Sequence, residues 1–332
     1  MRTVSLTWCL LRYTLRKSVH TESIVCLSTV PPDFNINEIV NLNKKVKSKT
    51  RKVAKAPQLT KAAASKTVKD PNHESPKLKA VPECFSFVLD MPLYSGMEVD
   101  QNRALEFREV IEELNINYLP SVSTIITQTQ PSAQKAALDR WQKQKTKELG
   151  GEEQFEAYKQ EIFDTGSSLH KAIELRLQGE TEITVSNKSG GHWESVQRAL
   201  GEVSDVKVIE TACVHQDVFY QGKFDCVAKL RDTLCLIEWK TSSKPKPLLS
   251  STYDNPLQVA AYIGAVNRSQ LVKQCQVENI TNGALVIAYP SGEPATVHMM
   301  SKKQVERYWA RWNERLFHYW CQRYAQAQEM AR

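Results

Sequence analysis

Three consecutive segments of this 332-residue chain alternate apolar with polar residues and are rich in β-branched and aromatic side chains. They run from Lys207 to His215, from Val218 to Lys229 and from Thr233 to Lys240. A period of two residues is typical of strands that bury one face, and Arg231 and Asp232 form a tight connection between the last two segments. We therefore expect three adjacent strands, the last two of which are joined by a tight turn.

Helical patterns lie on both sides of these strands. Before them we expect a short helix capped by Ser121 or Ser123, then helices at Pro131–Leu149, Glu152–Phe163, Ser167–Gln178 and His192–Leu200. After them we expect a helix at Leu257–Val266, strands at Gly283–Tyr289 and Ala295–Met300, and a closing helix from Lys302 to about Tyr324. Helices, strands and helices in this order predict one domain of the α/β or α+β class, with a helical N-terminal part.

The composition places the chain among globular proteins that carry an excess of positive charge. Hydrophobic residues make up 41% and charged residues 24%, which is enough apolar material to bury a core. The net charge of +7 favours a polyanionic partner. No segment approaches the run of about 20 apolar residues that a membrane-spanning helix needs. We therefore expect a soluble protein with no membrane insertion.

The first 30 residues have the features of a targeting segment. Arg2, Arg12, Arg16 and Lys17 are present, and no acidic residue occurs before Glu22. This pattern is typical of mitochondrial transit peptides. An alternative is that Leu6–Leu11 forms the apolar region of a signal peptide, but that run is short and basic residues follow it. We predict a presequence over residues 1–30 and a location in the mitochondrial matrix.

Residues 31–81 differ in composition from the rest of the chain. Asn43–Ala80 holds twelve lysines and arginines against Asp70 and Glu74, and it has no aromatic residue. Such a segment buries too little apolar area to offset the entropy of ordering, so we predict a disordered basic linker. It would act either as a solvated tether or by attracting the phosphates of a nucleic acid. The folded domain should then span residues 82–328.

Asp225, Glu238 and Lys240 are the charged residues of greatest chemical interest. Asp225 lies in one predicted strand, whereas Glu238 and Lys240 lie on one face of the next, in a segment otherwise suited to burial. Charges at such positions are costly unless they are paired or bind a metal. Two carboxylates hold Mg²⁺ or Mn²⁺ through oxygen, and an adjacent lysine balances charge on a phosphate. The arrangement predicts the hydrolysis of phosphodiester bonds.

A Glu-x-Lys triplet alone is weak evidence, because a surface ion pair produces the same pattern. Four further residues accompany it in a fixed order. His170 and Glu174 are four residues apart on a predicted helix before the strands, and Gln258 and Tyr262 are four apart on the helix that follows them. Residues four apart lie on one helix face. The ordered set favours a functional site over an isolated ion pair.

This order, which begins at Gly166 with Gly-x-x-x-His-x-x-x-Glu, resembles that of the PD-(D/E)XK nuclease superfamily and specifically its RecB-like branch. The resemblance covers roughly residues 121–289. It implies a restriction-endonuclease-like core, in which a central mixed β-sheet is flanked by helices. It also implies that Asp225 and Glu238 bind the metal with His170, and that Lys240 is the catalytic lysine. Gln258 and Tyr262 would support the active site and the nucleic-acid strand, and Glu174 would belong to the same support or be only a helix-surface acid.

The resemblance also implies an activity, with some departures from the pattern. We expect a metal-dependent exonuclease that acts on single-stranded DNA at free ends and flaps, using Mg²⁺ or Mn²⁺. Together with the presequence, this activity implies a role in mitochondrial DNA replication, repair and maintenance. Other mitochondrial replication proteins are then expected as partners. The second acid is Glu238 where many members have aspartate. Some relatives hold an iron–sulfur cluster on four cysteines, but the eight cysteines here lack that spacing, so we predict none.

The sequence is also compatible with two other functions, and two surface features each have two interpretations. One rival is an endonuclease or RNase of the same superfamily, and the other is a catalytically silent nucleic-acid-binding protein. Aromatic residues at helical spacing between Val305 and Trp320 would either stack bases or pack against the sheet. The basic residues within Gln128–Lys147 would belong either to an arch that grips a strand or to a solvated helix face.

Overall fold

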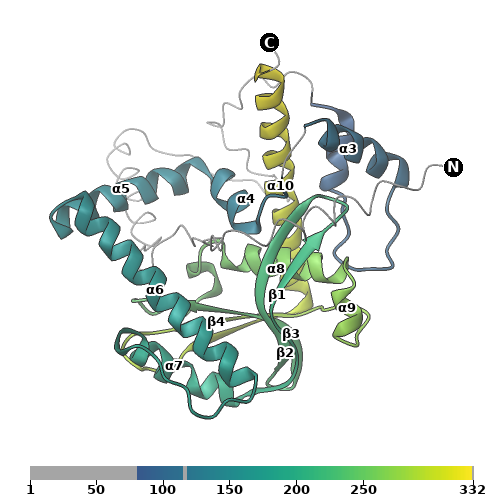
Figure 1. The fold of residues 1–332 in the computed structure, drawn as a ribbon. Helices are drawn as coiled ribbons and strands as arrows, with labels where there is room; N and C mark the ends of the chain where they lie inside the picture. Colours follow the sequence, from purple (N-terminus) through teal and green to yellow (C-terminus); the bar gives the residue numbers. More distant parts are fainter. Residues whose placement is uncertain (1–80, 115–117, 331–332) are drawn as a thin grey trace, which may run out of the picture.

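The computed structural model describes residues 81–114 and 118–330, and it is built around a five-stranded sheet with helices on both faces (Figure 1). The strands lie in the order β1-β2-β3-β4-β5. Their bounds are β1 Val203–His215, β2 Tyr220–Leu230, β3 Thr233–Thr241, β4 Gly283–Ala288 and β5 Thr296–Met300. The predicted presequence and, apart from Val81, the predicted linker lie outside the described residues.

The helices include elements that the sequence pattern did not indicate. The α-helices are α3 Gln101–Glu113, α4 Val122–Gln128, α5 Ser132–Leu149, α6 Glu152–Leu177, α7 Gly190–Gly201, α8 Asn255–Asn267, α9 Leu271–Gln274 and α10 Lys302–Met330. The 3₁₀ turns are η1 Glu83–Val88, η2 Asn187–Ser189 and η3 Leu249–Ser251. Of these, η1, η2, η3, α3 and α9 were not predicted, and α10 continues beyond the expected end at Tyr324.

The sheet is mixed. β1, β2 and β3 form an antiparallel meander, β4 runs parallel to β3 after the crossover through α8, and β5 returns antiparallel. The turn between β2 and β3 consists of Arg231 and Asp232, with φ of 51° and 61°. Positive φ at both turn residues matches the right-handed twist of a two-residue hairpin. The predicted adjacent strands, the tight turn and the predicted fold class are all confirmed.

The two faces of the sheet bury separate apolar clusters. From β3, Ile237 and Trp239 pack with α6 and α7, whereas Leu236 packs on the opposite side with α8 and α10. Because strand side chains alternate between faces, Glu238 and Lys240 emerge on the α8 side. The alternation of β3 thus directs an acid and a base toward one helix.

The prediction of two helices over Glu152–Phe163 and Ser167–Gln178 was wrong, because a single helix, α6, runs through both. Gly166 lies in its interior, where glycine costs about 1 kcal/mol relative to alanine. Tertiary packing offsets this cost, since Phe155, Leu169 and Ile173 are buried along the helix. The helices at Ser121, Pro131, His192 and Leu257 were correctly predicted to within a few residues.

The aromatic residues of α10 belong mostly to the core. Trp309, Trp312 and Trp320 are almost completely buried. The indole Nε1 of Trp309 donates to the carbonyl of Met91, and that of Trp320 donates to the carbonyl of Val218. These tryptophans therefore pack the fold together, and base stacking by them is excluded.

The structure also bears on two expectations from composition, one about membrane-spanning helices and one about the cysteines. None of the helices within residues 81–114 and 118–330 combines the length and apolarity that crossing a bilayer requires. Six of the eight cysteines lie in this part of the chain, and all six are buried free thiols. The absence of an iron–sulfur cluster stays a prediction.

His215, at the end of β1, should make the stability of the fold sensitive to acid. The ring stacks on Trp309 and is fully buried, and neither nitrogen has a hydrogen-bond partner within the described part of the chain. Burial, aided by Arg268 and opposed by Asp217, lowers its pKa from 6.5 to about 3. Between these values the unfolded chain binds a proton that the folded chain does not, so stability falls as the pH drops below 6.5, by up to about 1.4 kcal/mol per pH unit.

Urea unfolding of the wild type and of His215→Phe, from pH 7.5 to pH 5, tests this expectation. The phenylalanine variant should gain stability relative to wild type as the pH falls. A difference between the two proteins that stays constant over this range would contradict the assignment.

Candidate active site

The candidate site lies where β2 and β3 separate. Their antiparallel ladder ends at the pair Cys226 and Ile237. Beyond this pair the side chain of Asp225 replaces the missing strand contact, because its Oδ2 accepts a hydrogen bond of 2.7 Å from the backbone N–H of Trp239. The carboxylate of Asp225 is thereby fixed next to Glu238, and both residues are buried.

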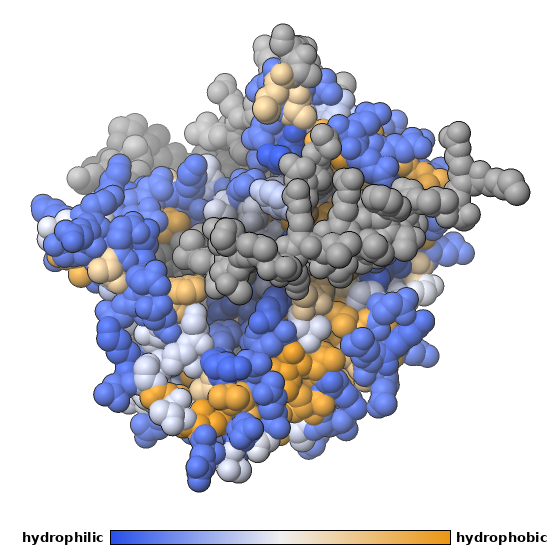
Figure 2. Space-filling view, in the orientation of Figure 1, coloured by the Kyte–Doolittle hydropathy of each residue, from blue (hydrophilic) through white to orange (hydrophobic). Residues whose placement is uncertain are grey.

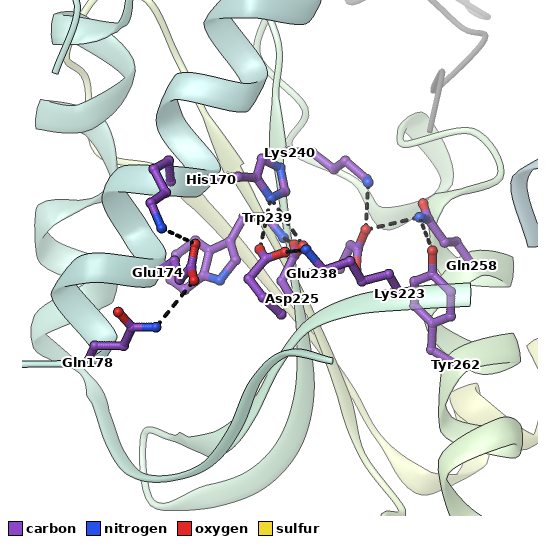
Figure 3. A network of polar contacts seen from close by, with 12 residues as sticks. His170, Glu174, Gln178, Lys223, Asp225, Glu238, Trp239, Lys240, Gln258 and Tyr262 are labelled. Carbon is purple, nitrogen blue, oxygen red and sulfur yellow. Dashed lines mark hydrogen bonds and ion pairs between the residues drawn. The ribbon is translucent and has the colours of Figure 1, made fainter. Parts of the chain in front are cut away.

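Glu238 and Lys240 form an ion pair on one face of β3. Lys240 Nζ lies 2.7 Å from Glu238 Oε1, and only 15% of the lysine side chain is exposed (Figure 3). The other oxygen, Oε2, is buried and has no hydrogen-bond partner among the described residues. A buried carboxylate oxygen without a partner is costly, and a metal ion is one means of satisfying it.

Helix α8 also holds Glu238, through the same oxygen that Lys240 contacts. Gln258 Nε2 donates to Glu238 Oε1 at 3.0 Å and lies 2.9 Å from the hydroxyl of Tyr262, one helical turn further along (Figure 3). Gln258 and Tyr262 are both buried. The spacing of four residues therefore produces a short chain of polar contacts that ends on the carboxylate.

The position of Tyr262 depends on a glycine in β2. A Cβ atom at Gly222 would lie 2.4 Å from Cε1 of Tyr262, which is too close for any side chain. We expect Gly222→Ala to displace the tyrosine ring, to loosen the Gln258 contact with Glu238, and to destabilise the fold by about 1–3 kcal/mol. Chemical denaturation measures the effect.

Gly166→Ala is the matched control for this substitution. Apart from its chain neighbours and the nearby backbone of its own helix α6, no described atom lies within 4 Å of the corresponding Cβ. Alanine should therefore stabilise the protein by about 0.5–1 kcal/mol. If both variants unfolded at the denaturant concentration of the wild type, close packing of Gly222 against Tyr262 would not contribute to stability.

Helix α6 brings His170 to the carboxylates, but it does not bring Glu174. His170 Nδ1 lies 3.1 Å from Asp225 Oδ1. Glu174, one turn later, contacts Lys171 and Gln178 of its own helix, at 2.9 Å and 3.2 Å (Figure 3). Among the described residues, the side chain of Glu174 therefore forms hydrogen bonds with residues of its own helix and not with the carboxylates of the site.

Glu210 belongs to this site and was missed by the sequence reasoning. Ile209 pairs with Cys226 and Thr211 with Phe224, so the register places Glu210 opposite Asp225. Ligand atoms of His170, Glu210 and Asp225 lie within 4.8 Å of one another. The only sequence signal was an acidic residue inside a predicted strand. Finding it would have required the register, which depends on contacts between strands.

The charges of the site perturb one another strongly. Burial alone would lower the pKa of His170, but the charge of Asp225 and the close carboxylates of Asp225 and Glu210 raise it to about 10. Burial and then the charge of Asp225 raise the pKa of Glu238 to about 7. Burial also acts to raise the pKa of Asp225, but His170, Lys240 and the backbone N–H of Trp239 together outweigh it and hold that pKa below its usual value. Perturbed groups that converge on one place are typical of functional sites.

These residues fit a hard divalent cation. Asp225, Glu238 and Glu210 offer carboxylate oxygens, and His170 offers an imidazole nitrogen. Oxygen-rich donor sets suit Mg²⁺ and Mn²⁺. The unsatisfied Oε2 of Glu238 is the specific observation that supports the fit, because a cation would supply the partner that it lacks.

Comparison with known sequences agrees with this geometry. Residues 109–332, more than half of the chain, match the sequence profile of the PD-(D/E)XK nuclease superfamily. The chain belongs to the PD-(D/E)XK nuclease superfamily. Both the resemblance derived from the ordered residues and the expected fold class are thus confirmed.

Three curated proteins are similar to this PD-(D/E)XK chain. Each is called mitochondrial genome maintenance exonuclease 1. The mouse protein is 42% identical over 211 residues, which make up 62% of this chain and 60% of the mouse protein. The human protein is 39% identical over 212 residues (62% and 59%), and the Xenopus tropicalis protein is 39% identical over 203 residues (60% and 57%). The chain therefore matches about 60% of the length of these relatives.

Proposed function

We propose that this protein is a metal-dependent exonuclease that hydrolyses single-stranded DNA from free ends and flaps in mitochondrial DNA maintenance. Membership of a nuclease superfamily and the name shared by three relatives support nuclease action on DNA. One structural observation carries the proposal. Asp225 and Glu238 lie buried side by side where two strands part, with Lys240 paired to the glutamate and one carboxylate oxygen unsatisfied. A protein that only binds DNA has no use for carboxylates in this position.

The chain's own residues have distinct tasks in this proposal. Asp225, Glu238 and His170 would hold Mg²⁺ or Mn²⁺, and the bound cation supplies a Lewis acid and lowers the pKa of a water molecule. Lys240 orients the attacking water and balances the charge that develops on the phosphate. Gln258 keeps Glu238 Oε1 in place, and Tyr262 keeps Gln258 in place. Glu174 is at most a distant support, since its described partners lie on α6.

The hairpin of α5 and α6 gives the proposal a candidate surface for the substrate. It extends away from the sheet (Figure 1), and its surface is largely hydrophilic (Figure 2). The two helices of the hairpin contact each other through Trp141, which packs on Phe155, and through Lys145, which lies over the ring of Tyr158. Its lysines and arginines would attract a DNA strand that leads to His170 farther along α6. A solvated helix face is the alternative, and the salt dependence of DNA binding by Lys143→Gln distinguishes the two.

Release of nucleotides from end-labelled single-stranded DNA in the presence of Mg²⁺ or Mn²⁺ tests the activity. Chelation of the metal should abolish cleavage. A circular single-stranded substrate should stay intact if the enzyme needs an end, and its cleavage would favour an endonuclease. Equal cleavage of labelled RNA would favour an RNase. A wild-type protein that neither binds Mn²⁺ in calorimetry nor cleaves any substrate would be the catalytically silent binder.

The mitochondrial part of the proposal has its own test. The acid-free N-terminal composition and the names of the relatives support it. Residues 1–30 fused to a fluorescent protein should direct it to the mitochondrial matrix, and a fusion of residues 31–81 should not. Diffuse fluorescence of the first fusion would contradict the predicted presequence.

A further inference from the structure

Three carboxylates of the site contact basic side chains of the protein. Lys240 pairs with Glu238, and His170 contacts Asp225. The third pair joins Lys223 of β2 to Glu210 of β1, with 2.5 Å between Nζ and Oε2. The catalytic lysine and the histidine have roles in the proposed function, whereas Lys223 and Glu210 have none.

Lys223 differs from Lys240 in its access to solvent. Its side chain is 60% exposed, compared with 15% for Lys240. It precedes Asp225 by two residues on the same strand, and both residues lie beside Glu210, Lys223 through the ion pair and Asp225 through the cluster of possible ligand atoms. The side chain of Lys223 lies beside the acids in Figure 3. It can therefore turn into solvent without leaving the rim of the site.

Glu210 is held at the centre of the site by the backbone. Its φ is 48°, a left-handed conformation that is costly for a residue with a side chain. Such strain persists where surrounding structure imposes it and is concentrated at functional sites. Its Oε1 lies 3.8 Å from His170 Nδ1, so the carboxylate spans the space between Lys223 and the atoms that would face a cation.

We propose that Glu210 is a ligand or close partner of the divalent cation, and that Lys223 is the exchangeable counter-cation of the site. While no metal is bound, Lys223 neutralises Glu210. A divalent cation beside Glu210 repels the ammonium group, which then turns to a phosphate of the entering DNA strand. Binding of the metal and binding of DNA are thereby coupled through one lysine. The inference rests on the proposed metal-dependent nuclease function and adds two residues to its site.

Calorimetric titration of the full chain with Mn²⁺, without DNA, is the primary test. Lys223→Gln removes a competing positive charge and should tighten Mn²⁺ binding by about three- to tenfold. Glu210→Gln should weaken binding by about tenfold, the size expected for a group that supports a metal site. In the double variant the gain from Lys223→Gln should disappear, because the two residues act through one contact.

Lys229→Gln is the matched control. Lys229 lies on the same strand, is 43% exposed, and pairs with Asp205 at 3.2 Å instead of with the site. Its Mn²⁺ affinity should equal that of wild type. If the Lys223→Gln variant bound Mn²⁺ with the same affinity as the Lys229→Gln control, the inference would be wrong. Because Lys223 is exposed, its substitution should not impair folding.

The coupling to DNA has a separate readout. In a Lys240→Ala background, which should keep the substrate intact, Mn²⁺ should tighten binding of a fluorescent oligo-dT, and Lys223→Gln should remove most of that gain. An equal gain with and without Lys223→Gln would overturn the coupling. If wild type binds Mn²⁺ and cleaves DNA while the Lys223 and Glu210 variants titrate like wild type, only this inference fails. If wild type binds no Mn²⁺ and cleaves nothing, the proposed function fails with it.

Discussion

Lys240→Ala should lower the cleavage of single-stranded DNA by at least about a hundredfold without weakening the binding of Mn²⁺. The lysine is largely buried and is held 2.7 Å from Glu238 Oε1. Its ammonium group is therefore positioned to act on a water or phosphate at the carboxylates, and alanine removes this stabilisation of the transition state. Binding of Mn²⁺ should be unchanged or tighter, because the substitution removes a positive charge next to the metal's carboxylate.

Single-turnover cleavage of end-labelled DNA and calorimetry with Mn²⁺ measure the two parts of this prediction. Lys229→Ala is the control, since that lysine lies on the neighbouring strand and pairs with Asp205. Its cleavage rate should match that of wild type. If Lys240→Ala cleaved as fast as wild type, the assignment of the site would be wrong.

Asp225→Asn should remove the stabilisation of the fold by metal as well as the activity. At a free Mn²⁺ concentration of about 100 times the dissociation constant, a bound ion adds about 2.7 kcal/mol to the stability of the folded state. For a domain of this size that corresponds to a rise in Tm of roughly 5–10 °C. Asparagine keeps an oxygen that can accept from Trp239 N–H, so the fold should survive while the charge that attracts the metal is lost.

Thermal unfolding with Mn²⁺ and with chelator compares the two proteins. Wild type should show the shift in Tm, Asp225→Asn should show almost none, and its cleavage should fall by at least about a thousandfold. Asp217→Asn is the control, because Asp217 pairs with Arg268 outside the site. A full metal-induced shift in Asp225→Asn would exclude Asp225 as a principal ligand.

The interruption that the sequence suggested in α6 shows one limit of prediction from pattern. Gly166 is a poor helix former and lies between Phe163, the predicted end of one helix, and Ser167, the predicted start of the next. Local propensity alone therefore favours two helices. The helix nevertheless continues, because it buries Leu169 and Ile173 against the sheet. This continuity matters for the site, since it connects the α5–α6 hairpin rigidly to His170.

Glu210 shows a second limit. No spacing along the sequence relates it to Asp225, which lies fifteen positions further on, in a different strand. Its place opposite Asp225 follows from the pairing of β1 with β2, in which the register changes between Ser204 and Val208. An irregularity of this kind has no reliable local signature, so the residue emerged only with the structure.

The features of the site that depend on local geometry could be predicted from the amino-acid sequence. A strand has a period of two, so Glu238 and Lys240 had to share a face, and a helix has 3.6 residues per turn, so Gln258 and Tyr262 had to share another. Three other features required the folded structure: the place where β2 and β3 part, the acid that lies opposite Asp225, and the position of α8 facing Glu238. These depend on contacts between residues far apart in the chain, and such contacts are fixed by the packing of the whole core.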